Sequence, residues 1–160
     1  MLLIFLNAQK LSSQTPSCRY SSIRIQKQTF IYPDLKTMAC LFEQPFDSVW
    51  MKGLTPLGFK CVKIDNSSDF IQYEKQTGRY FQMANFDAFF YIVSLRWQDN
   101  EGKVSMLRPI LKKLDVMPIV KSVFDTYELV YGGRKYWLGF RSTIQSHGEL
   151  VEDFTIEIAR

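Results

Sequence analysis

The chain has 160 residues, of which 46% are hydrophobic, 22% charged and 15% aromatic, and this composition fits one domain with a core of its own. With only eight Gly and six Pro, the chain is not low-complexity, collagen-like or broadly disordered. The formal net charge at pH 7 is +4, which raises nucleic acid and anionic membranes as partners.

The excess positive charge lies near the N-terminus. The first 33 residues contain four basic residues and no acidic one, and the first carboxylate is Asp34. From Asp34 to Arg160 the remaining 16 basic residues are matched by 16 acidic residues, so this part is formally neutral. Because tracking a phosphate backbone requires a concentrated Lys/Arg surface, the neutral body disfavours nucleic-acid binding.

Residues 1–37 are basic and rich in Ser, Gln and Thr, which is typical of an organelle transit peptide. Two alternatives stay open: a start of translation at Met38, and a flexible arm used in binding. A secretory signal fits poorly, since no charged residue precedes the apolar run from Leu2 to Leu6. We therefore expect a leader over 1–37 and a single domain over 38–160. The protein would lie in the cytoplasm or an organelle interior and would not be secreted.

The three cysteines favour reduced thiols. Cys18, Cys40 and Cys61 make an odd number and form no CxxC pair, so neither a disulfide framework nor a zinc knuckle is indicated. No stretch approaches the roughly 18 consecutive apolar residues of a membrane-spanning helix. We therefore expect no membrane span.

The first expected element of the domain is a short helix over 46–55. Phe46, Val49 and Trp50 recur at helical spacing, and Asp47 can cap the first turn. Pro and Gly residues directly after this stretch would stop the helix.

The period then changes to two, which is typical of antiparallel strands joined by short turns. The run from Ala88 to Leu95 is apolar at both parities and predicts a central strand covered on both faces. The expected strands cover 59–64, 70–75, 79–83, 88–97 and 103–107.

Two short helices are expected next, with Pro118 separating them. Leu107, Ile110 and Leu111 share one helical face, and residues 119–127 continue helical spacing. Three strands follow, over 126–131, 134–144 and 150–159, with a Gly132-Gly133 turn between the first two. The sequence thus predicts an α+β domain, with a mainly antiparallel sheet of about seven or eight strands and helices packed on one face.

Catalytic and cofactor signatures are absent from the sequence. His147 is the only histidine, and no Cys-His signature, HExxH, EF-hand loop, GxGxxG or P-loop is present. We interpret His147 as a solvated turn residue and expect no metal and no other cofactor. Enzyme activity is not favoured.

The strand over 134–144 carries the main functional hypothesis. Lys135, Trp137 and Arg141 fall on one face of it, opposite an apolar face. Trp and Arg are over-represented at interface hot spots, so this face indicates a non-catalytic binding protein that contacts a protein partner or a second copy of the chain. The alternative is that a helix or a further layer covers Trp137 as ordinary core.

A second hypothesis is a carrier or enzyme with a pocket for a small apolar or aromatic ligand between sheet and helices, because residues 70–97 carry nine aromatic rings. Glu152 shares the inward parity of its strand and would be the polar group of such a pocket, but we expect the strand start to fray and let Glu152 reach water. The third hypothesis is single-stranded nucleic-acid binding through the leader and Trp137. The expected pocket residues are Phe90, Tyr91, Tyr127, Tyr136, Phe140 and Glu152.

Overall fold

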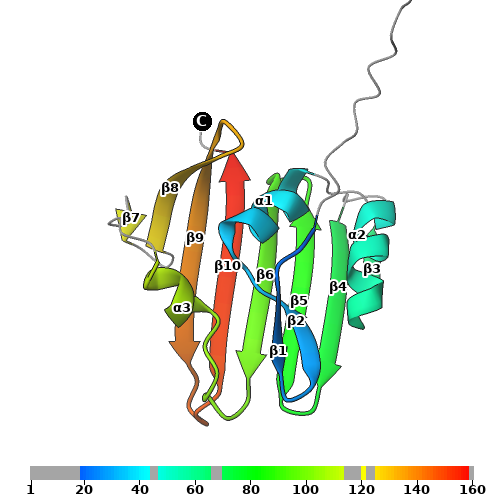
Figure 1. Cartoon of the computed structure of the whole chain (residues 1–160), viewed down its shortest axis with the longest axis vertical. Coiled ribbons are helices and arrows are strands. Elements are labelled where there is room, and N and C mark those ends of the chain that lie inside the picture. Colours follow the sequence, from blue (N-terminus) through cyan, green and yellow to red (C-terminus); the bar gives the residue numbers. More distant parts are fainter. Residues whose placement is uncertain (1–18, 44–46, 66–69, 114–119, 122–124, 159–160) are drawn as a thin grey trace, which may run out of the picture.

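An eight-stranded antiparallel sheet forms the centre of the molecule (Figure 1). The computed structural model describes residues 19–43, 47–65, 70–113, 120–121 and 125–158. The sheet has the order β3-β4-β5-β6-β10-β9-β8-β7, so the last strand of the chain lies in its middle. Its strands are β3 (Lys60–Asp65), β4 (Phe70–Thr77), β5 (Tyr80–Asp87), β6 (Ile92–Asp99), β7 (Val120–Lys121), β8 (Asp125–Tyr131), β9 (Arg134–Ile144) and β10 (Leu150–Ile158).

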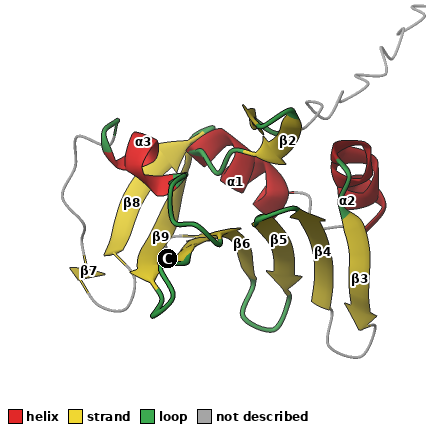
Figure 2. Cartoon of the chain, turned by 90° about the horizontal axis from the view of Figure 1, so that it is seen from below, coloured by secondary structure: helices red, strands yellow, loops and turns green. Residues whose placement is uncertain are grey.

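The helices lie on one face of this sheet (Figure 2). They are α1 (Leu35–Glu43), α2 (Asp47–Leu54), the 3₁₀ turn η1 (Thr55–Leu57) and α3 (Leu107–Leu111). Alternate side chains of the central strands point toward them and form the core with residues of α1 and α2. Core residues with no exposed area include Met38, Leu41, Trp50, Leu95, Trp97, Phe154 and Ile156. The predicted α+β class, with a mainly antiparallel sheet, is confirmed.

A hairpin of β1 (Ser22–Ile25) and β2 (Gln28–Ile31) also packs on the helix-covered face. Phe30 and Ile31 are fully buried, and the Phe30 ring meets the Trp97 ring edge-on with centroids 5.1 Å apart. Neither this hairpin nor α1 was predicted from the sequence. Apolar residues of β2 belong to the core. The packed part of the chain therefore begins before the domain boundary expected near residue 38.

The helix expected over 46–55 is present as α2, followed by η1. Pro56 lies within η1, and Gly58 ends it with a left-handed φ of 88°. A Cβ is poorly tolerated in this conformation, which is why Gly fits the C-terminal cap.

The strand expected over 88–97 starts later than the sequence suggested. Residues 88–91 form the turn between β5 and β6, and β6 begins at Ile92. Phe89 and Phe90 are 85% and 64% exposed, so this apolar run is not covered on both faces. Since adjacent antiparallel strands need a turn, connectivity overrides the β-propensity of these residues.

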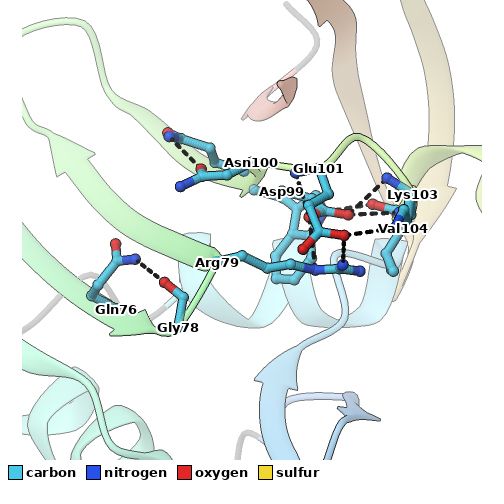
Figure 3. A network of polar contacts seen from close by, with 10 residues as sticks. Gln76, Gly78, Arg79, Asp99, Asn100, Glu101, Lys103 and Val104 are labelled. Carbon is cyan, nitrogen blue, oxygen red and sulfur yellow. Dashed lines mark hydrogen bonds and ion pairs between the residues drawn. The ribbon is translucent and has the colours of Figure 1, made fainter. Parts of the chain in front are cut away.

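The strand expected over 103–107 is also wrong, and the carboxylate of Asp99 explains why (Figure 3). Asp99 is fully buried at the end of β6. Its Oδ2 accepts the backbone N–H groups of Lys103 (2.9 Å) and Val104 (2.8 Å), and its Oδ1 accepts that of Glu101 (3.1 Å). Arg79 Nε lies 3.2 Å from the same Oδ1. These N–H groups are therefore used in a loop and are not available to a strand ladder.

The second helix of the expected central pair is replaced by strand wherever that stretch is described. Val120 and Lys121 form β7 and pair with Thr126 and Asp125 of β8. β-branched Val and Thr favour strands, so neighbouring strands override the helical spacing here. The rest of 114–124 lies outside the described residues. The Gly132-Gly133 turn is confirmed, with φ of 58° and 78°.

Candidate partner-binding surface on the sheet

Strand β9 places the three predicted partner-binding residues on one face of the sheet. Its alternate residues Tyr136, Leu138 and Phe140 are buried toward the helices. Lys135, Trp137 and Arg141 therefore point to the opposite face, which none of the described helices covers (Figure 2). We call Arg96, Lys135, Trp137, Arg141 and Asp153 the open-face cluster.

The polar centre of this cluster is a carboxylate between two guanidinium groups. Strand register aligns Arg96 of β6, Asp153 of β10 and Arg141 of β9 in one row. Arg96 Nε donates to Asp153 Oδ1 at 2.7 Å, and Arg141 Nε donates to Oδ2 at 3.1 Å, with a second bond to Oδ2 from Arg141 Nη2. The Asp153 side chain is 10% exposed, and those of Arg96 and Arg141 are 40% and 36% exposed. The row carries a net charge of one positive unit, and both guanidiniums still reach solvent.

Trp137 lies between two acidic residues of neighbouring strands. The register places Glu128 of β8 on one side and Glu157 of β10 on the other. Glu128 is itself paired, because its Oε1 lies 3.0 Å from Lys135 Nζ. Trp137 is half-buried, so part of its ring is available to a partner. The arrangement can bind a carboxylate at the guanidiniums and pack an apolar group on the indole.

The residues expected to line one pocket are not brought together. Tyr127, Tyr136 and Phe140 are buried core residues, and Phe90 lies in the exposed β5–β6 turn against Phe89. Tyr91 contacts the rings of Phe42 and Phe86 from the same turn. Among the described residues, a cavity of about 450 Å³ touches Glu152, and a separate one of about 190 Å³ touches Phe140.

The expectation that Glu152 reaches water through a frayed strand end is wrong. Glu152 is 1% exposed. Its Oε1 accepts the Ser105 hydroxyl at 2.5 Å, and its Oε2 accepts the N–H groups of Met106 (2.7 Å) and Leu107 (3.0 Å). The burial is tolerated because three donors replace water. Glu152 thus fixes the start of α3 to β10.

The phenol of Tyr136 stays protonated near neutral pH. Burial, with a smaller contribution from Glu43, raises its pKa from 10.0 to about 12. Its hydroxyl donates to Glu43 Oε1 at 2.6 Å, and Arg134 bonds the same carboxylate. Tyr136 therefore acts as a structural link between β9 and the end of α1.

The positions of His147 and of the cysteines test the expectations of a solvated turn histidine and of reduced thiols. His147 is exposed, as expected, and its Nδ1 lies 3.2 Å from the Ser146 hydroxyl oxygen. Cys61 is exposed on β3, and Cys18 lies outside the described residues. Cys40 is disulfide-bonded, in contrast to the expectation of reduced thiols. In the part of the chain that the structure describes, no three His, Cys, Asp or Glu residues form a group suited to a metal ion.

Sequence reasoning missed two members of the open-face cluster. Arg96 and Asp153 are 57 residues apart, and only the adjacency of β6 and β10 joins them. In the sequence, each of these two residues is a charged residue at a strand position whose side chain points away from the core. That pattern occurs on many solvated strands and does not identify a partner.

A scan of protein-family models gave no match to this chain, and searches among curated proteins and solved structures gave none either. Within the described residues, no helix is long and apolar enough to cross a membrane.

Proposed function

We propose that this chain is a non-catalytic binding protein that contacts a protein partner through the open-face cluster. The observation that carries the proposal is the position of Trp137. The alternative was that a helix or a further layer covers this residue, but the described helices lie on the other face and the indole is half-buried (Figure 2). A half-buried Trp on the same strand face as Arg141, four residues away along β9, has the composition of an interface hot spot.

The charges of the cluster indicate the chemistry of the partner. Arg96 and Arg141 share one carboxylate, that of Asp153, so these three side chains together carry a net charge of one positive unit. A partner carboxylate would bind the exposed edges of the guanidiniums by charge-assisted hydrogen bonds. We propose a protein surface that presents an acidic residue next to an aromatic or aliphatic one, which would pack on Trp137.

Photo-crosslinking from the cluster tests this proposal. Trp137 would be replaced by p-benzoylphenylalanine in cells that express the full chain, and the crosslinked proteins would be identified by mass spectrometry. Thr143 is the matched control position, because it is exposed on the same strand and the same face. The proposal expects a specific adduct from position 137 that is absent from position 143.

The affinity for the crosslinked protein then tests the residue roles. Arg141→Gln and Trp137→Ala should each weaken binding at least about tenfold, the loss expected for hot-spot residues. Thr143→Ala should leave binding unchanged. An adduct with a second copy of the chain would make the partner a homo-oligomer. Equal adducts from both positions, or unchanged affinity in both variants, would overturn the proposal.

A further inference from the structure

The cavity of about 450 Å³ lies between α3 and the end of the sheet where β9 and β10 meet. It opens on the helix-covered side, because Ser142 and Ile144 continue the parity of the buried Phe140 on β9. Its volume falls in the range of small-molecule sites. It is lined by Gly102, Ser105, Leu107, Arg108, Leu111, Lys112, Ser142, Ile144, Leu150 and Glu152.

The apolar part of the lining suits a hydrocarbon chain. Leu107 and Leu150 are each 6% exposed and form an apolar base. Leu111 and Ile144 are 39% and 72% exposed, so they stand where a ligand would enter. Covering two large exposed aliphatic side chains would be favourable by the hydrophobic effect, at about 25 cal/mol per Å² of apolar area.

Two cations stand beside these aliphatic groups. Arg108 lies in α3, and Lys112 is the C-cap residue of this helix; both are exposed and line the cavity. Neither enters an ion pair with any other described residue, whereas Lys135 and Arg141 on the far face are both paired. Two unpaired cations on one side of an apolar cavity complement an anionic head group.

The carboxylate of Glu152 does not supply the missing partner. Its two oxygens already accept Ser105, Met106 and Leu107, and it is 1% exposed at the base of the cavity. A ligand head would therefore stay at the exposed Arg108 and Lys112, with its tail directed over the leucines.

We propose that this cavity binds an amphipathic carboxylate, a single acidic head on a hydrocarbon tail. The head would bind Arg108 and Lys112, and the tail would cover Leu111 and Ile144. The site is on the opposite side of the sheet from the open-face cluster and does not depend on it.

Three probes with the same ten-carbon tail test the proposal: decanoate, decanol and decyltrimethylammonium. Each is titrated into the full chain below its micellar concentration, with calorimetry for affinity and amide chemical shifts for location. We expect decanoate to bind most tightly and decyltrimethylammonium most weakly. Shifts should concentrate in residues 105–112 and 142–152.

Matched variants of α3 test the role of the cations. Arg108→Gln combined with Lys112→Gln should weaken decanoate binding about tenfold or more, and the decanol affinity should change little. Lys113→Gln is the control, because Lys113 is an exposed cation beside the same helix that lines only the other cavity. Ile144→Asp should weaken decanoate and decanol together; Ile144 is 72% exposed, so the variant should fold.

Several results would overturn the proposal. These are equal affinity for decanoate and decanol, an unchanged decanoate affinity in the double variant, shifts confined to the aromatic turn at 88–91, or binding of decanoate only as micelles. Trp137→Ala should leave decanoate binding intact, so failure here and failure of the proposed partner surface are distinguishable.

Discussion

Gln82 and Ile31 form a reciprocal pair of hydrogen bonds. Gln82 Nε2 donates to the Ile31 carbonyl oxygen at 2.7 Å, and the Ile31 N–H donates to Gln82 Oε1 at 2.9 Å. Gln82 is fully buried in β5, so its side-chain amide takes the place that a neighbouring strand would have for β2. This pair attaches the N-terminal hairpin to the face of the sheet.

Replacing Gln82 should loosen that attachment. Gln82→Ala leaves a buried N–H and a buried carbonyl of Ile31 without partners, and each should cost about 1–3 kcal/mol. We expect urea unfolding to show a total loss of about 2–6 kcal/mol, with faster amide exchange in residues 22–31. Gln76→Ala on the exposed end of β4 is the control and should change stability by less than about 0.5 kcal/mol. Equal stability of the two variants would show that the pair contributes nothing.

Replacing Gly102 and Gly78 by Ala distinguishes the effect of steric crowding on stability from the effect of backbone strain. Both have a left-handed φ, 64° and 55°. A Cβ at Gly102 would lie 2.4 Å from the carbonyl oxygen of Gly148, whereas a Cβ at Gly78 would meet nothing within 4 Å. Each Ala variant should lose about 1 kcal/mol from its φ, and Gly102→Ala should lose more because the turn of Gly148 must move. Thermal unfolding of both variants measures the difference between their losses of stability. This difference should vanish only if the turn at Gly148 moves freely.

Tyr136 should make stability depend on pH in the alkaline range. Its pKa is raised from 10.0 to about 12 in the folded protein, so between these values the unfolded chain releases the proton first. The contribution of Tyr136 is complete below pH 10 and is lost as the pH rises toward 12. Urea unfolding at pH 8, 10 and 11 should therefore show the advantage of the parent chain over Tyr136→Phe shrinking with pH. An advantage that does not change with pH would contradict this prediction.

Glu152 should hold α3 in place. Glu152→Ala leaves the Ser105 hydroxyl and two backbone N–H groups without an acceptor, so we expect a loss of about 3 kcal/mol or more. Glu152→Gln keeps one acceptor oxygen and should lose less. Hydrogen exchange should accelerate first in residues 106–111. The exposed Glu128→Ala is a control for loss of a carboxylate on the surface.

The exposed aromatic turn should be neutral for stability. Phe89→Ser combined with Phe90→Ser removes rings that are 85% and 64% exposed, so unfolding should change by less than about 0.5 kcal/mol per residue. Phe30→Ala, in the core, should cost about 3–5 kcal/mol. A large loss from the double variant would place these rings in the core after all, as the apolar run suggested.

The strands that sequence reasoning located best are those bounded by strong turn signals. Strand β9 has the expected bounds of 134–144, because Gly132 and Gly133 supply the positive φ that a tight hairpin turn needs. For strands without such a signal, the predicted bounds differ from the observed ones. At Ala88, for example, an apolar run forms a turn. The hairpin at 22–31 was missed because its few apolar residues follow a basic stretch that resembles a leader.

The candidate surface was predictable only in part. The parity of β9 places Lys135, Trp137 and Arg141 on one face, and this follows from the two-residue period alone. Arg96 and Asp153 join them through strand order, which is set by long-range pairing and leaves no mark in the local pattern. Strand register also separates the predicted pocket residues. Tyr136 pairs with Ile158 and Glu152 pairs with Ser142, so these two residues lie on the same face but far apart along the strands.

The central position of β10 sets the order in which the sheet can be completed. Strands β3 to β6 form a continuous meander, but β6 has its second neighbour only when residues 150–158 are available. During synthesis, the edge of β6 would stay unpaired until β10 has left the ribosome. An open edge of this kind can pair with other chains, so β10 also protects the nascent protein from aggregation.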